Sequence, residues 1–282
     1  MIHVLCGGAV LIGLLLATLL PFAPGRFDVA AVPLSSFAQG LGLGSLLVAP
    51  IGCVWWIHSL RHRPGDLAAG RVRHRYASAV LAVLALVGLL AALLAGAQWS
   101  LSLGAILALL WLACVWRLGS WSRARASTSP GPDRAAPLLC LVVPGLYLFA
   151  WIQLGDPAAA YARDRAIRNA APLLADIEAF HAARGSYPIA LQSLWGDYVP
   201  DVVGIERYRY EPHGAAYNLF FEQPTLTFGA RVIAMYNPRD EQAFSSHDSD
   251  LLRLAPEDVE RQRGFLSVET APQPHWKSFL FD

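Results

Sequence analysis

Charge is scarce in this sequence of 282 residues, in which charged residues make up 15% of the chain; a typical soluble domain has about 25%. Hydrophobic residues reach 55%, and the mean hydropathy is +0.40. This composition excludes a wholly soluble protein. It also argues against a disordered chain, because disorder combines low hydrophobicity with high net charge, whereas the net charge here is +1.

The small net charge conceals two different halves. Residues 1–154 hold 10 Arg and 3 Asp, for a formal charge of +7, whereas residues 155–282 hold 12 basic and 18 acidic residues, for −6. We predict a transmembrane domain over residues 1–154 and an exported α+β domain over residues 155–282.

Cysteine is absent from residues 155–282. The second half therefore has no disulfide framework. The four cysteines of the chain lie within apolar stretches, where they are expected to behave as small hydrophobic side chains: Cys6, Cys53, Cys114 and Cys140.

Five apolar stretches are candidates for membrane spans, since a hydrocarbon core of about 30 Å needs about 20 helical residues. The stretch over residues 76–97 contains no charged residue at all. The sequence therefore predicts an α-helical bundle of five spans: residues 2–22, 37–60, 76–97, 99–121 and 138–154.

The loops between these stretches alternate in charge. Residues 61–75 and 117–134 are rich in Arg, whereas residues 23–36 hold one Arg and one Asp. Because Lys and Arg close to a span stay in the cytoplasm, the N-terminus is predicted to be cytoplasmic and residues 155–282 extracytoplasmic. We expect a multi-pass protein of the inner (cytoplasmic) membrane, with a periplasmic second domain and membrane lipid around its spans.

Catalytic signatures are missing as well. The middle of each predicted span lacks Asp, Glu, Lys and Arg, which argues against a transporter. Ser45 and His58 cannot form a dyad, because 13 residues along one helix separate them by about 20 Å. No G-x-S-x-G, H-E-x-x-H, phosphate-loop or dinucleotide motif is present, so the chain is predicted not to be an enzyme.

The second half begins with helical signals. Asp156 and Pro157 are typical of a helix start, Pro172 of an interruption and Gly185 of a helix end. A short helical turn is then expected to place Leu191, Leu194 and Trp195 together. These three residues are predicted to join the core of the domain, with Leu173, Ile177, Phe180, Tyr208, Tyr210, Leu219 and Val232.

The hydrophobic period changes to two after this turn. Tyr208 and Tyr210 alternate with charged residues, as in a half-buried strand. We predict a small antiparallel sheet packed on the long helix, and a short helix over residues 256–263. The strands are expected over residues 207–211, 217–221, 231–236, 265–268 and 276–281, and Pro212, His213 and Gly214 are expected to form the turn after the first strand.

This pattern resembles a known family. A long helix leaving a membrane span, the residues Gly185, Ser186, Tyr187 and Pro188, and the following strands look like the type IV pilin and type II secretion pseudopilin domain, over residues 140–236. In that family the turn and its leucines pack a connecting segment onto the long helix. The resemblance implies a pilin-like fold and an envelope partner, such as a secretion or pilus assembly.

The sequence also departs from that family. Its fifth span has neither the peptidase cleavage site nor the Glu five residues into the helix that pilins carry. The resemblance therefore implies a pilin-like domain that stays tethered to its membrane anchor. It does not imply a polymerising pilin.

Aromatic residues are the candidate binding residues of the second half. Tyr236, Trp276 and Phe279 suit an interface anchor, because aromatic side chains dominate interface energetics. Trp276 has an alternative interpretation, in which it closes the core from the last strand.

A metal site is the other candidate. Asp248 and Asp250, beside His247, are the densest group of ligand-type residues and would suit calcium. A solvated loop is the alternative interpretation, and we predict no cofactor. Nucleic acid is not an expected partner, since the basic loops adjoin spans and the second half is acidic.

Two functional classes follow from these observations. The first is a non-enzymatic binding or accessory protein whose exported domain contacts an envelope protein. The second is a membrane-anchored protective protein, similar in role to a toxin-immunity protein, or a sensory protein.

Overall fold

The computed structural model describes residues 2–61, 67–128, 135–227, 230–242 and 267–281. Their contacts divide the chain into two compact units. The first unit contains Met1–Leu19 and Ala30–Gly155, and the second contains Leu20–Val29 and Asp156–Asp282. The division after Gly155 lies one residue from the predicted boundary. The grouping of Leu20–Val29 with the second unit has no counterpart in the local sequence pattern.

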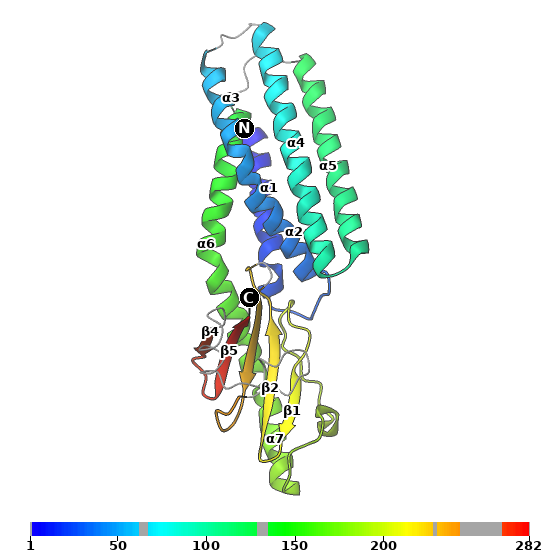
Figure 1. The fold of residues 1–282 in the computed structure, drawn as a ribbon, viewed down its shortest axis with the longest axis vertical. Helices are drawn as coiled ribbons and strands as arrows, with labels where there is room; N and C mark the ends of the chain where they lie inside the picture. The colour runs from blue at the N-terminus through cyan, green and yellow to red at the C-terminus, as the bar shows by residue number, and fades with distance from the viewer. Residues whose placement is uncertain (1, 62–66, 129–134, 228–229, 243–266, 282) are drawn as a thin grey trace. The chain divides into compact units, whose positions relative to one another are not determined.

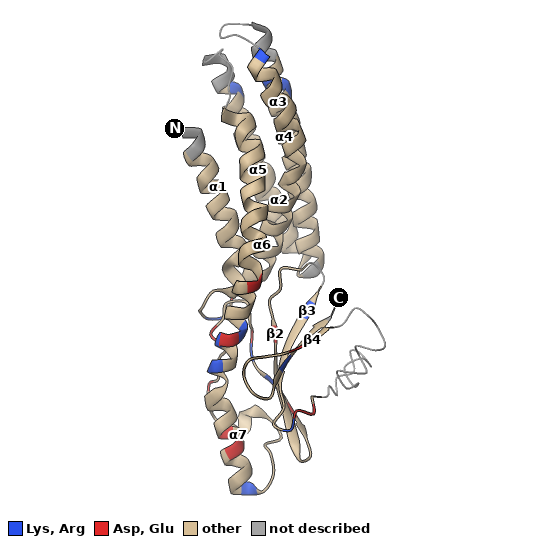
Figure 2. Cartoon of the chain, turned by 90° about the vertical axis from the view of Figure 1, so that its left-hand side faces the viewer, with Lys and Arg blue, Asp and Glu red and all other residues tan. Residues whose placement is uncertain are grey.

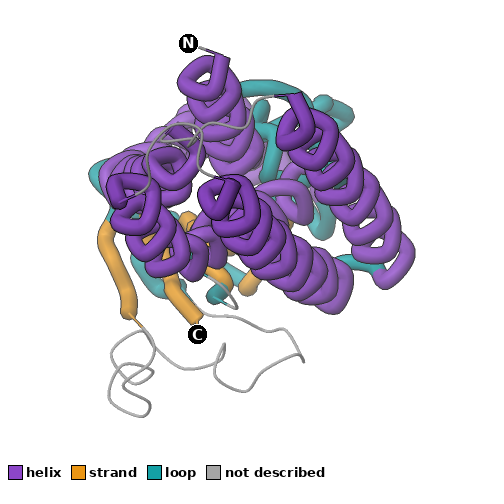
Figure 3. Tube along the Cα trace, turned by 90° about the horizontal axis from the view of Figure 1, so that it is seen from above, coloured by secondary structure: helices purple, strands orange, loops and turns teal. Residues whose placement is uncertain are grey.

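The first unit consists of helices that lie side by side (Figures 1 and 3). Five stretches are long and apolar enough to cross a membrane, judged by length and composition. This result confirms the predicted number of apolar helices. Their bounds are α1 (Ile2–Leu19), α2 (Ala31–Gly44) with α3 (Ala49–Arg61), α4 (Leu67–Gln98), α5 (Leu101–Thr128) and α6 (Ala135–Asn169). Charged residues among them gather towards helix ends (Figure 2).

The second apolar stretch is longer than predicted and is not uniform. It begins at Ala31 and contains a short 3-10 helix, η2 (Ser45–Val48), between α2 and α3. A 3-10 turn inside a longer helix is wound more tightly than the α-helices on either side.

Glycines permit close approach in this unit. A Cβ atom on Gly42 would lie 2.2 Å from the ring of Tyr147, and one on Gly52 would lie 2.8 Å from the Cβ atom of Cys140. Both partner residues lie on α6. Between α4 and α5, the indole Nε1 of Trp111 donates a hydrogen bond to the carbonyl of Leu84 at 2.9 Å.

The sixth helix corrects a sequence prediction. Asp156 and Pro157 do not start a new helix, because α6 runs without interruption from Ala135 to Asn169. A proline removes one backbone hydrogen bond but has a φ angle compatible with a helix. The neighbouring turns on both sides can therefore hold Pro157 in place.

The predicted interruption at Pro172 and the end at Gly185 are confirmed. Helix α7 covers Ala171–Arg184, with proline in its first turn. Gly185 has a φ of 71°, and its amide donates to the carbonyl of His181 at 2.8 Å. This left-handed conformation at a helix end favours glycine.

The second unit contains one antiparallel sheet with the order β1-β2-β3-β5-β4. Both β3 and β5 have their predicted bounds, and β2 and β4 are each displaced or extended by a few residues. The strands are β1 (Arg209–His213), β2 (Ala216–Gln223), β3 (Arg231–Tyr236), β4 (Ser267–Thr270) and β5 (Trp276–Phe281). The helix predicted over residues 256–263 lies outside the described residues.

The first strand differs from its prediction. Pro212 and His213 belong to β1 and do not form the turn, which instead contains Gly214 with a φ of 56°. Pro212 has no amide hydrogen to donate. It is tolerated because β1 is an edge strand of the sheet.

Helices cover one face of this sheet, as the α+β prediction requires. The last turns of α6 and helix α7 bury a stripe of apolar residues at helical spacing, and the hydroxyl of Tyr208 donates to the carbonyl of Ala166 at 2.6 Å. The opposite face carries a second buried cluster, formed by Phe220, Ile233, Met235 and Phe279. The buried stripe contains Ala162, Ala166, Ala170, Leu173 and Ile177.

The segment Leu20–Val29 pairs with residues 201–204 of the same unit. Pro24 and Val202 form an antiparallel bridge. Backbone hydrogen bonds extend the pairing on both sides: Gly25 to Asp201 (3.1 Å), Asp28 to Val203 (3.0 Å), Val203 to Ala23 (3.0 Å) and Gly204 to Pro21 (2.8 Å). We call the pairing of Leu20–Val29 with residues 201–204 the clip.

Side chains of α6 hold the other side of the clip. The Arg165 guanidinium forms an ion pair with the Asp201 carboxylate, and its Nε donates to the Asp201 carbonyl at 2.9 Å. Asn169 donates to the carbonyl of Pro200 at 2.8 Å. The clip is therefore tied to a rigid helix as well as to the chain after α1.

Candidate functional site

An aromatic cluster lies on the face of the sheet that the helices cover. Strand alternation places every second residue on this face. Tyr236 shares it with Trp276, because these two residues are direct partners in the pairing of β3 with β5. Tyr210 and Tyr217 reach the same face from β1 and β2, since each pairs with a residue of that face.

Tyr217 is the centre of this cluster. Its ring centroid lies 4.9 Å from that of Tyr187, 5.5 Å from that of Tyr210 and 5.9 Å from that of Tyr236. Its side chain is completely buried, and its hydroxyl interacts with Glu178 and Tyr236 without a well-formed hydrogen bond to either. The other three tyrosines are only partly buried. A buried hydroxyl without a well-formed hydrogen bond is uncommon in folded proteins.

Helix α7 adds a histidine and a carboxylate to the cluster. The His181 ring stacks on Tyr187 with a centroid distance of 4.1 Å and an interplanar angle of 15°. Glu178 lies three residues earlier and therefore on the same side of the helix. Its side chain is exposed.

The electrostatics of the cluster keep its tyrosines neutral. Burial raises the pKa of Tyr217, and the negative charge of Glu178 raises it further. Burial is also the main cause of the raised pKa values of Tyr187, Tyr210 and Tyr236, with Glu178 contributing to each. The charge of Glu178 is thus felt by all four hydroxyls.

A well-braced turn follows β3 at the edge of this cluster. The side-chain oxygen of Asn237 accepts hydrogen bonds from the amides of Arg239 and Glu241, and its nitrogen donates to Asn218 at 2.8 Å. Asp240 contacts the His275 ring nitrogen at 3.0 Å. This turn brings the positive charge of Arg239 close enough to Tyr187 to oppose the rise in the pKa of that hydroxyl.

The connector between α7 and β1, residues 185–208, exposes three large apolar side chains, Ile189, Trp195 and Val199, and the first two are the most exposed. Ile189 is 89% exposed and Trp195 is 95% exposed. Trp195 also has a φ of 57°, which is uncommon for a residue other than glycine. The prediction that Trp195 joins the core is wrong, and Leu191 and Leu194 are only partly buried. Helical spacing places the three residues close together but does not determine which side of the turn faces the sheet.

The predicted anchor residues occupy different environments. Tyr236 is half-buried in the aromatic cluster, whereas Trp276 is 2% exposed and Phe279 is 6% exposed. Trp276 packs between Tyr236 and Phe221, at centroid distances of 5.6 and 5.8 Å. In this conformation Trp276 and Phe279 pack inside the domain, and a binding role for Tyr236 stays a prediction.

The predicted calcium ligands, Asp248 and Asp250, lie outside the described residues. Within the part of the chain that is described, no group of three or more His, Cys, Asp or Glu side chains is placed to hold a metal ion. Calcium binding is therefore an open prediction.

The first unit contains a buried polar cluster of its own. The hydroxyls of Thr18 and Tyr147 lie 2.8 Å apart, and Ser35 donates to the carbonyl of Thr18 at 2.6 Å. Gln39 donates to Ser35 at 3.1 Å, while its side-chain oxygen has no partner. None of these groups is charged at neutral pH, so the cluster suits helix association by hydrogen bonds.

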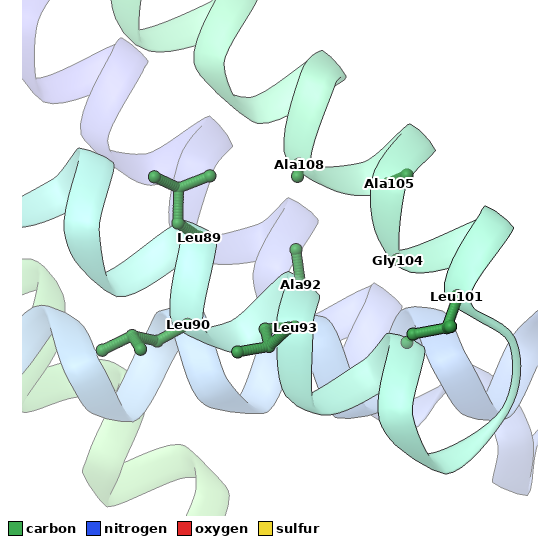
Figure 4. A pocket seen from close by; sticks show the side chains of 9 residues that line it. Leu89, Leu90, Ala92, Leu93, Leu101, Gly104, Ala105 and Ala108 are labelled. Carbon is green, nitrogen blue, oxygen red and sulfur yellow. The ribbon is translucent and has the colours of Figure 1, made fainter.

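A cavity of about 400 Å³ lies between α4 and α5 (Figure 4). Its lining is apolar and contains no ionisable side chain. Such a surface offers shape and hydrophobic contact but no catalytic group. The larger lining residues are Leu89, Leu90, Leu93 and Leu101, and the smaller ones include Gly104 and Ala108.

Sequence reasoning missed Glu178 and Tyr187 as members of one cluster. A partial signal existed, since Glu178 and His181 share a helix face and Tyr187 directly follows the helix end. The convergence itself depends on how α7 crosses the sheet, which no local pattern specifies. Comparison of the chain with protein-family models, with curated proteins and with solved structures finds no match.

Proposed function

We propose that the chain is a multi-pass membrane protein whose second unit binds a protein partner outside the cytoplasm. Five long apolar helices support the membrane assignment. Arginine in the loops beside α3, α4 and α5 supports a cytoplasmic location for those ends. The second unit is then extracytoplasmic, in the periplasm of a cell with an inner membrane.

The clip supports a common location for two segments of the chain. The segment Leu20–Val29 follows the first span, and it pairs through its backbone with residues 201–204. Backbone pairs of this kind form only between segments on the same side of a membrane. The charge pattern, which assigns both segments to the outer side, agrees with this pairing.

The exposed connector is the observation that best supports a binding function. Trp195 is 95% exposed in a segment that is otherwise fixed by a 3-10 turn and by the Tyr210 hydrogen bond to the Pro188 carbonyl at 2.9 Å. Exposing a tryptophan contributes nothing to folding through burial. Tryptophan is also enriched among residues that dominate binding energy at interfaces.

The pilin-like character of the second unit is part of this proposal. A long helix, a glycine-ended second helix and an antiparallel sheet against them support it. The domain would then present its connector to an envelope assembly, such as a secretion or pilus machine, while α1 to α6 keep it in the membrane. The missing catalytic motifs favour binding over turnover.

A cross-linking experiment tests the binding function. A photoreactive amino acid at position 189 of the full chain, an 89% exposed position in the same connector as Trp195, should capture a partner in intact cells. Trp195→Ala should abolish its recovery, because it removes the aromatic anchor. Tyr161→Ala is a matched control, since Tyr161 is an aromatic residue 47% exposed in α6.

The identity of the captured protein decides between the functional classes. A component of a secretion or pilus assembly supports the accessory function, whereas a secreted toxin supports a protective one. Normal recovery of the partner by Trp195→Ala would overturn the role of the connector.

A further inference from the structure

Three features of the aromatic cluster point to a ligand that the described residues do not supply. Three tyrosine rings surround the ring of Tyr217, whose buried hydroxyl makes no well-formed hydrogen bond. Glu178 lies one helical turn before His181, whose ring stacks on Tyr187, and its exposed carboxylate acts on the Tyr217 hydroxyl. Among the described residues, Glu178 forms no ion pair with Lys, Arg or His.

We propose that the rings of Tyr187, Tyr210 and Tyr236, together with Glu178, bind a cationic side chain, lysine or arginine, of the partner protein. This inference deepens the proposed function and rests on it for the identity of the partner. The site adjoins the exposed connector, because Tyr187 lies two residues before Ile189. One partner surface could therefore contact both.

Aromatic rings attract cations through their electron-rich faces, and the attraction grows when water is partly excluded. The three tyrosines around Tyr217 are half-buried. Water is therefore partly excluded from their rings, while part of each ring stays accessible. Glu178 supplies the opposite charge. A neutral apolar group would gain hydrophobic contact with the rings but would leave the Glu178 carboxylate without a counter-charge.

A metal ion fits this site less well than an organic cation. Glu178 is the one carboxylate that acts on all four tyrosine hydroxyls, whereas calcium takes about six to eight oxygen ligands. Ring faces do not replace such ligands. They do contribute to binding ammonium and guanidinium groups.

Among the residues that the structure describes, Arg239 is the Arg or Lys side chain that acts on the cluster. Arg239 acts on the Tyr187 hydroxyl, but it forms no ion pair with Glu178. A partner cation must therefore bind beside the Arg239 charge and against its repulsion. Removing that charge by Arg239→Gln is expected to strengthen binding.

The test uses the purified full chain in detergent micelles, with its nine tyrosines replaced by 3-fluorotyrosine. Fluorine NMR then follows titration with Nα-acetyl-lysine methylamide and with the corresponding arginine compound. The norleucine compound is the matched neutral control, because it keeps the alkyl chain and lacks the charge. Resonances of Tyr76 and Tyr161, outside the cluster, serve as internal references.

Saturable shifts confined to the cluster tyrosines are expected with the cationic probes. Glu178→Gln should weaken this binding about threefold or more. Glu206→Gln, at another exposed carboxylate of the unit, should leave it unchanged. Equal shifts with the norleucine probe, or unchanged binding in Glu178→Gln, would overturn the proposal.

The result of this titration can be distinguished from the result of the cross-linking experiment that tests the proposed function. The probes need no partner, so Trp195→Ala should bind them normally even though it loses the partner. Tyr236→Phe keeps the ring and should retain binding within about twofold, whereas Tyr236→Leu removes the ring and should weaken it. A Tyr236→Leu variant that is folded and binds normally would also overturn the site.

Discussion

The backbone amide of Val203 donates a hydrogen bond to the carbonyl of Ala23 at 3.0 Å, so a segment that follows α1 is paired with a segment that precedes β1. The neighbouring bridge between Pro24 and Val202 makes the pairing antiparallel. Two parts of the chain that are remote in sequence, on either side of four apolar helices, thus belong to one compact unit.

Cysteines at positions 24 and 202 should form a disulfide in a variant whose four native cysteines are replaced. Direct partners in an antiparallel pair have Cα atoms about 4.5 to 5.5 Å apart, a separation within the range that a disulfide requires. Oxidation should produce a faster band on a non-reducing gel. Cysteines at positions 24 and 206 are the control, and equal cross-linking of both pairs would contradict the clip.

Reporter fusions test the orientation. A reporter that is active only outside the cytoplasm should be active when fused after residue 282 and silent when fused within residues 61–75, because arginine retains that loop inside. Activity in the opposite pattern would reverse the topology. It would also exclude an envelope partner for the second unit.

Two tryptophans should respond differently to truncation. Trp276→Ala should cost about 3 to 5 kcal/mol in the free energy of unfolding of the second unit, because Trp276 is 2% exposed among aromatic rings. Trp195→Ala should change it by less than about 0.5 kcal/mol, since Trp195 is 95% exposed. Thermal unfolding followed by circular dichroism provides the measurement. Similar losses for both variants would show that the connector is packed.

The second unit should lose stability in alkali. Burial raises the pKa values of Tyr208, Tyr210 and Tyr217 above the ordinary tyrosine value of about 10. The folded state then holds protons that the unfolded state releases, so this contribution is complete below about pH 10 and is lost as the pH rises further.

Phenolate absorbance and circular dichroism, recorded together from about pH 9 upward, should show these tyrosines ionising as the fold is lost. Tyr208→Phe should reduce the slope of stability against pH above about 10, because it removes one such group. Independent ionisation of all tyrosines near pH 10 in an intact fold would contradict the burial of their hydroxyls.

Sequence patterns predicted the elements whose signal is local. The five apolar helices follow from composition, and β3 and β5 have their predicted bounds because apolar residues dominate each run. The prediction of a helix start at Pro157 is wrong, because a local rule cannot register the turns that stabilise α6 on both sides. The prediction of a turn at Pro212 is wrong because the tolerance of this proline depends on β1 being an edge strand.

Long-range features could not be derived in this way. The clip joins segments with no shared pattern, and its hydrogen bonds use backbone groups that every residue possesses. Trp195 was assigned to the core because it is apolar and correctly spaced, although only the packing of α7 determines which side of the turn is covered. The same packing decides that the charge of Glu178 acts on four tyrosine hydroxyls.

The 3-10 turn at Ser45–Val48 sets the rotational phase between α2 and α3. Each 3-10 residue turns the chain about 20° further than an α-helical residue does, which amounts to about 80° over four residues. In an unbroken α-helix, Gly42 and Gly52 would point about 80° apart. The overwound turn cancels this angle, so Gly42 meets Tyr147 and Gly52 meets Cys140, two turns away along α6. The two helices on either side of the 3-10 turn thereby present their glycines to the same helix, α6.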